Sequence, residues 1–292
     1  MALAIRKIKR QIRSVKNTQK ITKAMELVSA AKMRRAVSAV KLSRSYADLA
    51  WQAVLNLSQK TDPELHLLLT KPKEIKKVGV LVVGSNRGLC GVFNQQLLKK
   101  AVAFAASEKE VSSDVAIDFI TLGRKAALSL VKAGFNIAAD FPKTEIISAV
   151  GEIMPLSRML LDDFLDKKYD KIVLIYTDFI SSLRQQPTIK QLLPLVPQSK
   201  KSQENGTAEY IFEPDADSIL RNFLPRLLEM QIYQAVLESN ASEHSSRMLA
   251  MRNASDSAGG LLADLTLGFN KARQAGITQE IAEISVSKAA ME

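Results

Sequence analysis

Apolar side chains in the last quarter of the chain recur at alternating steps of three and four residues, from Leu220 to Gly276. Thirteen of the 17 positions on this line are apolar. The four interruptions are Gln234, His244, Ser255 and Gly276. This spacing keeps one narrow stripe, which we call the heptad seam, on the same side of a long helix and favours a left-handed supercoil. A helix over residues 215–289 would be about 110 Å long. It needs a partner of similar length to bury its seam.

The first 57 residues are the natural partner for that helix. Residues 4–57 contain neither Gly nor Pro, which favours a continuous helix. Apolar positions run three, four, three from Ile5 to Val15, and the spacing resumes at Thr18, Ile21, Met25 and Val28 after an extra step of three. The extra step predicts a stammer, a local overwinding of a coiled coil. Because Pro disfavours helix in the residue before it, we expect the helix to end before residues 61–63, Thr-Asp-Pro.

The middle of the chain has a different pattern, in which short apolar runs alternate with helical stretches. Residues 78–83 form a continuous apolar run typical of a strand buried on both faces. Further strands are predicted at 115–121 and 171–177, with possible edge strands at 187–195 and 209–212. Helices are predicted at 92–107, 124–133 and 153–166. Alternating strands and helices indicate an α/β fold with a mainly parallel sheet. The predicted domains are therefore 1–59, an N-terminal helix; 60–214, an α/β domain; and 215–292, a C-terminal helix.

The charge of the chain is concentrated at its N-terminus. The net charge is +11, yet residues 1–44 hold 13 Lys and Arg and a single acidic residue, Glu26. Such a basic arm is typical of segments that bind nucleic acid, an anionic membrane or an acidic protein surface, and its composition also fits a transit peptide. A solvated helix face is the simpler alternative. A basic coiled-coil protein that binds nucleic acid is the main alternative function, although no aromatic residue precedes Tyr46 for base stacking.

A glycine loop at residues 84–91, between a predicted strand and a predicted helix, is the only hint of ligand chemistry. Gly84, Gly88 and Gly91 are spaced four and three apart, which fits neither the P-loop nor the dinucleotide pattern. The loop glycines then permit a tight turn and close packing. A dehydrogenase-like enzyme built on the sheet is a weaker alternative for the same reason.

The residues that could carry catalysis or bind metal are few. Cys90 is the only cysteine and neither histidine, His66 or His244, is near it in sequence. A lone cysteine in a glycine loop is more often structural than nucleophilic. His244 occupies a seam position, where a polar residue sets helix register. We expect no catalytic residue, no cofactor and no metal site.

Three blocks of the sequence resemble the γ subunits of F-type ATP synthases, and the resemblance runs through the whole chain in the order of that family. The first block is IKRQIRSVKNTQKITKAMELV at residues 8–28, and the second is RGLCGVFN at residues 87–94. The third is ASEH at residues 241–244, continued by NKARQAGITQEI at residues 270–281. The first and third are long enough to be specific.

The resemblance implies a fold and a function. The terminal helices would form an antiparallel coiled coil, with a Rossmann-like α/β domain inserted between them. The chain would be a non-catalytic rotor shaft, one copy per complex, threading the ring of three α and three β subunits. Its partners would be the α and β subunits, the ε subunit and the c-ring, with no nucleic acid. Proton-driven rotation of the c-ring would turn the shaft and drive ATP synthesis on the β subunits.

The resemblance also implies roles for single residues. Met25, Arg247, Gln274 and Thr278 match family positions that contact the β subunit, although the spacing of Met25 equally fits a plain seam residue. The glycine-loop motif of the family corresponds to Gly88, Leu89, Cys90 and Gly91.

Two further expectations concern the ends of the chain. Beyond Gly276 the apolar positions shift to Ile277, Ile281 and Ile284, and this tip is expected to stand as a single helix. Because the first block begins at Ile8, we expect no presequence and a bacterial protein bound peripherally to the cytoplasmic side of the plasma membrane.

Overall fold

The computed structural model describes residues 2–60, 68–70, 72, 74–112, 114–144, 150–195, 216–289 and 291. It divides into two compact units. The helical unit consists of Met1–Ala30 and Arg247–Glu292, and the α/β unit is Ala31–Ser246. The predicted domain limits at residues 59/60 and 214/215 remain a prediction.

A five-stranded sheet forms the centre of the α/β unit, in the order β3-β2-β1-β4-β5. Its strands are β1 (Lys77–Val83), β2 (Ala116–Leu122), β3 (Ile137–Phe141), β4 (Lys171–Phe179) and β5 (Gln185–Leu193). The first four strands are parallel, and β5 pairs antiparallel with β4 at the edge. The strands predicted at 78–83, 115–121, 171–177 and 187–195 are confirmed, whereas β3 is an addition to the predicted set. The candidate strand at 209–212 lies outside the described residues.

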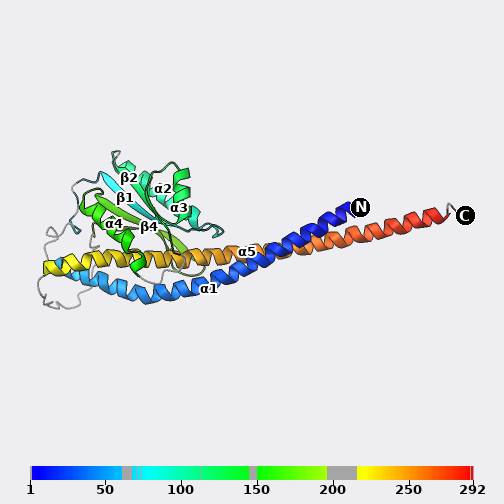
Figure 1. Ribbon diagram of the computed structural model, residues 1–292, viewed down its shortest axis with the longest axis horizontal. Helices are drawn as coiled ribbons and strands as arrows, with labels where there is room; N and C mark the ends of the chain where they lie inside the picture. Colours follow the sequence, from blue (N-terminus) through cyan, green and yellow to red (C-terminus); the bar gives the residue numbers. More distant parts are fainter. Residues whose placement is uncertain are drawn as a thin grey trace. The chain divides into compact units, whose positions relative to one another are not determined.

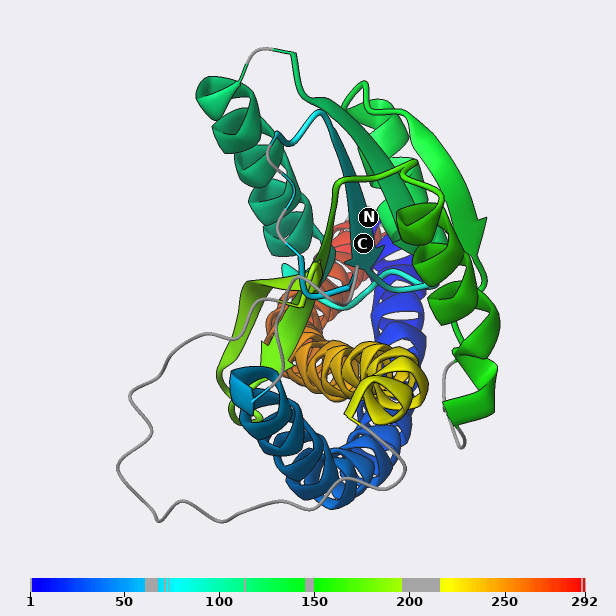
Figure 2. The same cartoon turned by 90° about the vertical axis from the view of Figure 1, so that its left-hand side faces the viewer.

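Helices cover both faces of this sheet (Figures 1 and 2). On one face, α2 (Phe93–Val111) and α3 (Arg124–Lys132) pack on Val78, Val80 and Val82 of β1. On the other face lie α4 (Met154–Leu165) and parts of the two long helices, α1 (Ala2–Lys60) and α5 (Ala216–Ala289). The predicted fold class, an α/β domain with long helices from both ends of the chain, is confirmed.

Within the α/β unit, α5 is buried on almost every side. All eight residues from Glu238 to Ser245 are at most 5% exposed. The sequence predicted a single seam here. The prediction was incomplete because the sheet and α4 cover faces of α5 that a two-helix coiled coil would leave in water.

Within the helical unit, α1 and α5 run antiparallel. The side chain of Gln19 reaches the carbonyl oxygen of Ser255 at 3.4 Å, and a Cβ on Gly276 would lie 3.7 Å from Ile5. Every seam position of α5 from Met248 to Gly276 is buried or half-buried, while most positions between them are exposed. The predicted heptad seam is therefore confirmed in this unit.

The predicted stammer in α1 is wrong. After Val15 the half-buried or buried positions continue in steps of four and three. They are Gln19, Thr22, Glu26 and Ser29, and Met25 and Ala30 beside them are also half-buried. Ile21 and Val28, which were assigned to the seam, are 61% and 55% exposed. The helix keeps its heptad register because polar and small side chains fit opposite the small residues of α5, among them Gly259, which faces Gln19.

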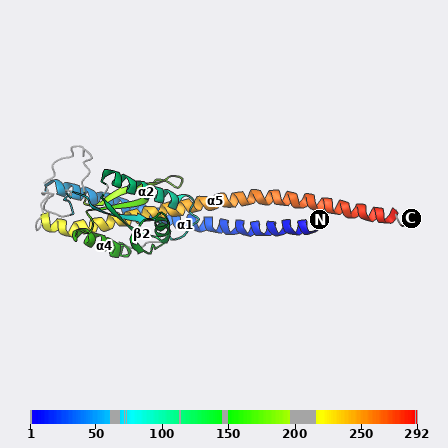
Figure 3. The same cartoon turned by 90° about the horizontal axis from the view of Figure 1, so that it is seen from above.

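The end of α5 extends beyond the N-terminus of α1 (Figure 3). Past Gly276 all described side chains are exposed, including the apolar Ile277, Ile281 and Ile284. The expected single-helix tip is confirmed. Among the described residues, none of the helices combines the length and apolar character that a membrane span requires.

Candidate functional site

The glycine loop joins β1 to α2, and its first glycine is fixed by close packing. A Cβ on Gly84 would lie 2.5 Å from the Cβ of Ala126 in α3, and a Cβ on Gly123, whose φ is 114°, would lie 3.0 Å from the Gly84 backbone. Gly91 has φ 58°, whereas Gly88 has nothing within 4 Å of the place a Cβ would take. The loop therefore serves close helix–sheet packing and a tight turn, as its spacing predicted.

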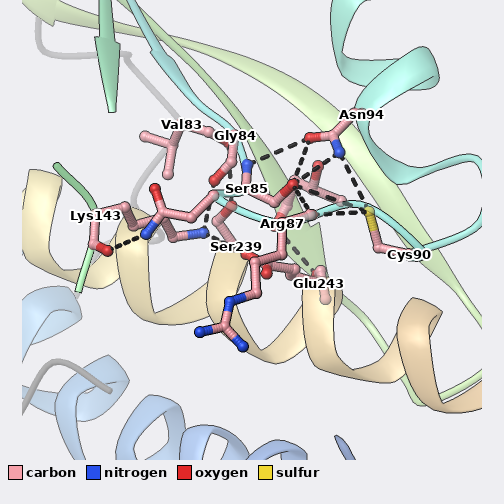
Figure 4. Close-up of polar contacts among 12 residues, drawn as sticks. Val83, Gly84, Ser85, Arg87, Cys90, Asn94, Lys143, Ser239 and Glu243 are labelled. Atoms are coloured by element: carbon pink, nitrogen blue, oxygen red, sulfur yellow. Dashed lines mark hydrogen bonds and ion pairs between the residues drawn. The ribbon is translucent and has the colours of Figure 1, made fainter. Parts of the chain in front are cut away.

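The polar groups of this loop bond to one another (Figure 4). The Asn94 amide nitrogen donates to the Ser85 hydroxyl at 2.7 Å and lies 3.2 Å from the Cys90 sulfur. Ser85 Oγ donates to the Arg87 carbonyl at 2.8 Å. Cys90 is 2% exposed. This arrangement supports the structural interpretation of Cys90. Leu89, in contrast, points to solvent at φ 60° and is 63% exposed.

The carboxyl edge of the sheet is where doubly wound α/β proteins bind their ligands, at the point where the strand order reverses. Here that point lies between β1 and β4, and α5 occupies it (Figure 4). Ser239 Oγ donates to the Val83 carbonyl at the end of β1 at 3.2 Å. Ser242 Oγ donates to the Thr177 carbonyl of β4 at 3.2 Å. The helix thus occupies the position at which doubly wound α/β proteins bind their ligands.

A buried ion pair completes this contact. Lys143, two residues after β3, donates from Nζ to Glu243 Oε2 of α5 at 2.8 Å and to the Gly84 carbonyl at 2.7 Å. The side chains of Lys143 and Glu243 are only 2% and 7% exposed. The Asn86 amide in turn donates to the Lys143 main-chain carbonyl. Sequence reasoning missed this pair, because the two residues are 100 positions apart.

A second polar cluster joins α1, α5 and β4. Arg44 Nη2 lies 2.7 Å from Glu238 Oε1 and 3.5 Å from Asp178 Oδ1. Burial raises the pKa of Asp178, the negative charge and hydrogen bond of Glu238 raise it further, and Arg44 opposes the shift. Burial, followed by Glu238 and Asp178, also raises the pKa of Tyr176.

The four residues expected to contact the β subunit all lie in the helical unit but differ in exposure. Met25 is half-buried and Arg247 is 8% exposed. Gln274 and Thr278 are exposed one helical turn apart, and Thr278 Oγ1 donates to the Gln274 carbonyl at 3.0 Å. Their contact roles remain predictions, as does the role of the motif Gly88 to Gly91.

The outer surface of α1 in the helical unit is basic and partly apolar. Its basic side chains all point to solvent: Arg6, Lys7, Lys9, Arg10, Arg13, Lys16, Lys20 and Lys23. Ile21, Leu27 and Val28 are 55–61% exposed on the same helix. Sequence reasoning assigned Ile21 and Val28 to the seam; continuing the strict heptad from Val15 through Gln19 would have placed them outside.

Among the residues that the structure describes, no group of three or more His, Cys, Asp or Glu is arranged to hold a metal ion.

The whole chain is similar to known ATP synthase components. A family model described as ATP synthase matches residues 4–291. The ATP synthase gamma chain of Chloroflexus aurantiacus is 43% identical over 288 residues, which cover 98% of each chain. The gamma chain of Stenotrophomonas maltophilia is 38% identical over 286 residues, covering 98% of this chain and 99% of the relative.

Solved structures share the fold at lower identity. A chain of the Euglena gracilis mitochondrial ATP synthase, in a structure of OSCP, F1 and the c-ring, matches with a TM-score of 0.67 at 18% identity and covers 100% of this chain and 95% of its own. A chain of the Tetrahymena thermophila central stalk and c-ring matches with a TM-score of 0.61 at 21% identity, over 80% of this chain and 99% of its own. Because the family model and the sequence relatives match nearly the whole chain, the chain belongs to the gamma chain family of the ATP synthases.

Proposed function

We propose that the chain is the central rotor shaft of an F-type ATP synthase. Rotation of a c-ring driven by proton flow turns the shaft, and the shaft drives each β subunit in turn through the conformations that make and release ATP. The observation that carries the proposal is the match to gamma chains over nearly the full length.

The helical unit has the features that such a shaft requires. Two antiparallel helices share a heptad seam, and one continues alone as a tip with exposed isoleucines. Around a pseudo-threefold ring, an asymmetric helix pair offers different contacts to three chemically identical subunits. Differential contact free energy between conformations is what coupling between sites requires.

The basic surface of α1 suits sliding contact with an acidic partner. Exposed ion pairs contribute only about 0–1 kcal/mol each, so many weak contacts attract the partner without locking it. We place the candidate contacts Met25, Arg247, Gln274 and Thr278 on this shaft.

The subunit itself is proposed to be non-catalytic. In support of this, α5 fills the edge of the sheet where α/β enzymes bind ligands, and Ser239, Ser242 and Glu243 occupy the space with bonded side chains. Catalysis would belong to the complex.

The partners proposed are the ring of three α and three β subunits, the ε subunit and the c-ring, with one copy of this chain per complex. The solved neighbours come from assemblies described as central stalk and c-ring or as OSCP, F1 and c-ring. Because relatives such as those of Chloroflexus and Stenotrophomonas are bacterial, we place the chain on the cytoplasmic side of a bacterial plasma membrane, held peripherally by its partners.

The test is reconstitution with matched α and β subunits, followed by native mass measurement and observation of rotation. Cys90 is buried, so the probe belongs on Val111→Cys, a position 87% exposed at the end of α2, in a Cys90→Ser background. One copy with three α and three β subunits, together with ATP-driven rotation, is the expected result. A chain that joins no ring and instead binds DNA with strong salt dependence would establish the nucleic-acid alternative.

A further inference from the structure

We propose that Lys143 is a positioning residue that fixes the rotational setting of α5 against the sheet, so that the α/β domain and the long helix turn together. The inference rests on the proposed rotor function and adds a residue outside the helices to the coupling machinery.

The apolar part of this contact resists rotation only weakly. Hydrophobic burial is non-directional, because it depends on the area removed from water and little on orientation. The residues of α5 that meet the sheet edge are mostly small, as at Ser239, Ala241, Ser242 and Ser245, all completely buried. Small side chains give this stretch of the helix a smooth surface, so its contact with the carboxyl ends of the strands opposes rolling only weakly.

The ion pair, in contrast, is directional and attached at both ends. Lys143 Nζ bonds the Gly84 carbonyl at the end of β1 and the Glu243 carboxylate of α5, at 2.7 and 2.8 Å. The Asn86 amide holds the main chain of Lys143 itself. Successive residues of a helix are separated by about 100°. A roll of that size would move the Glu243 carboxylate away from the buried Lys143 ammonium group, and breaking a buried ion pair is strongly unfavourable.

Hydroxyl bonds strengthen the same contact along the helix. Ser239, Ser242 and Ser245 donate to carbonyls at the ends of β1 and β4 and in the β4–β5 turn, where Ser245 Oγ lies 2.7 Å from the Ser182 carbonyl. Each is a neutral bond made by a freely rotating hydroxyl, whereas charge-assisted bonds are about twice as strong. Lys143 therefore makes a stronger bond to this stretch of α5 than any of the three serine hydroxyls does.

The test compares two double variants in the reconstituted α3β3 complex, with the probe on Val111→Cys in the Cys90→Ser background. Lys143→Met with Glu243→Leu removes both charges of the pair together. Lys171→Met with Glu108→Leu is the matched control, because that 2.7 Å pair joins β4 to α2 and does not involve α5. The readout is the angular variance of the probe during pauses between ATP-driven steps.

We expect the Lys143/Glu243 double variant to raise the angular variance about twofold, since satisfied polar networks rigidify the groups that they join. The control double variant and Lys143→Arg, which keeps the cation, stay near the wild-type variance. A folded Lys143/Glu243 double variant with unchanged variance would overturn the proposal. So would a double variant that fails to assemble, because the pair would then act in folding. A wild-type chain that does not rotate would instead refute the rotor function.

Discussion

At the scale of single residues, Gly84 and Gly88 of the glycine loop look alike in the sequence but differ in how closely their surroundings pack. We predict that Gly84→Ala destabilises the protein by about 1–3 kcal/mol, because the new Cβ would lie 2.5 Å from that of Ala126 and overpack the contact between β1 and α3. Denaturant unfolding monitored by circular dichroism would measure the change. Gly88→Ala is the control: it meets nothing within 4 Å and should change stability by no more than about 0.5 kcal/mol. Equal losses in both variants would contradict the packing role of Gly84.

Asp178 predicts a specific dependence of stability on pH. Burial and Glu238 raise the pKa of its carboxyl group above its ordinary value. An acid whose pKa is higher in the folded state contributes stability that is fully present below the unfolded pKa and is lost as pH rises through the folded pKa. The ionised carboxylate is therefore unfavourable at neutral pH, apart from its weak contact with Arg44 at 3.5 Å.

We predict that Asp178→Asn raises the melting temperature at pH 7–8, and that this gain shrinks as the pH falls below about 3.9, the ordinary pKa of Asp, so that the carboxyl group becomes protonated in both states. Melting curves of both proteins across this pH range provide the measurement. Asp170→Asn removes the same charge from a carboxylate that accepts two main-chain N–H bonds at 2.8 Å, and it should lower stability at neutral pH instead. A gain for Asp178→Asn that grows towards acid would reverse the assigned sign.

Some of these residue roles could be predicted from sequence and others could not. The glycine spacing alone excluded the phosphate-binding patterns, and the structure supplies the packing reason. The Lys143–Glu243 pair joins residues 100 positions apart, and the Arg44–Glu238 pair joins residues 194 apart. Such contacts exist only once the sheet order is known, and no local pattern marks either residue.

At the scale of secondary structure, periodicity predicted most elements and failed in two instructive places. The run at 78–83 is apolar throughout, so β1 was clear, whereas β3 reads Ile-Ala-Ala-Asp-Phe and sits at a sheet edge with alternate residues exposed. A short half-exposed strand gives too weak a pattern. In α1, the spacing of apolar residues predicts a seam through Ile21 and Val28, and this prediction is wrong because the inward positions Gln19 and Thr22 are polar.

The corrected register of α1 yields a matched pair of substitutions. Ile12 is half-buried on the seam, whereas Ile21 is 61% exposed. We predict that Ile12→Ser lowers the local stability of the helical unit by about 1 kcal/mol, the value of a partly buried apolar side chain. Ile21→Ser should change it by less than about 0.5 kcal/mol. Native-state hydrogen exchange of residues 5–30 measures both. A larger loss of local stability from Ile21→Ser than from Ile12→Ser would mean that Ile21 lies on the seam, as the stammer predicts.

At the scale of the whole molecule, charge and packing are divided between the two units. The N-terminal 44 residues carry a charge of +12 against +11 for the whole chain, and in the helical unit these basic side chains face solvent rather than pairing across the seam. The α/β unit instead contains the buried ion pair of Lys143 and Glu243 and the carboxyl edge of the sheet, which α5 covers. One unit is thus built to present a charged surface, and the other to hold α5 firmly.

This distribution predicts how the chain associates with its ring. If the basic surface of α1 steers the shaft towards acidic partners, Arg13→Gln with Lys20→Gln should lower the association rate with α3β3 by about threefold or more at low salt. Lys99→Gln with Lys100→Gln removes the same charge from exposed positions of α2 and should have little effect. The difference should vanish near 0.5 M salt, at which the Debye length is only about 4 Å. Stopped-flow measurements with a fluorescent chain would give the rates.

Equal slowing by both double variants would mean that net charge matters and the position of the arm does not, leaving the apolar residues Ile21, Leu27 and Val28 as the recognition surface of α1.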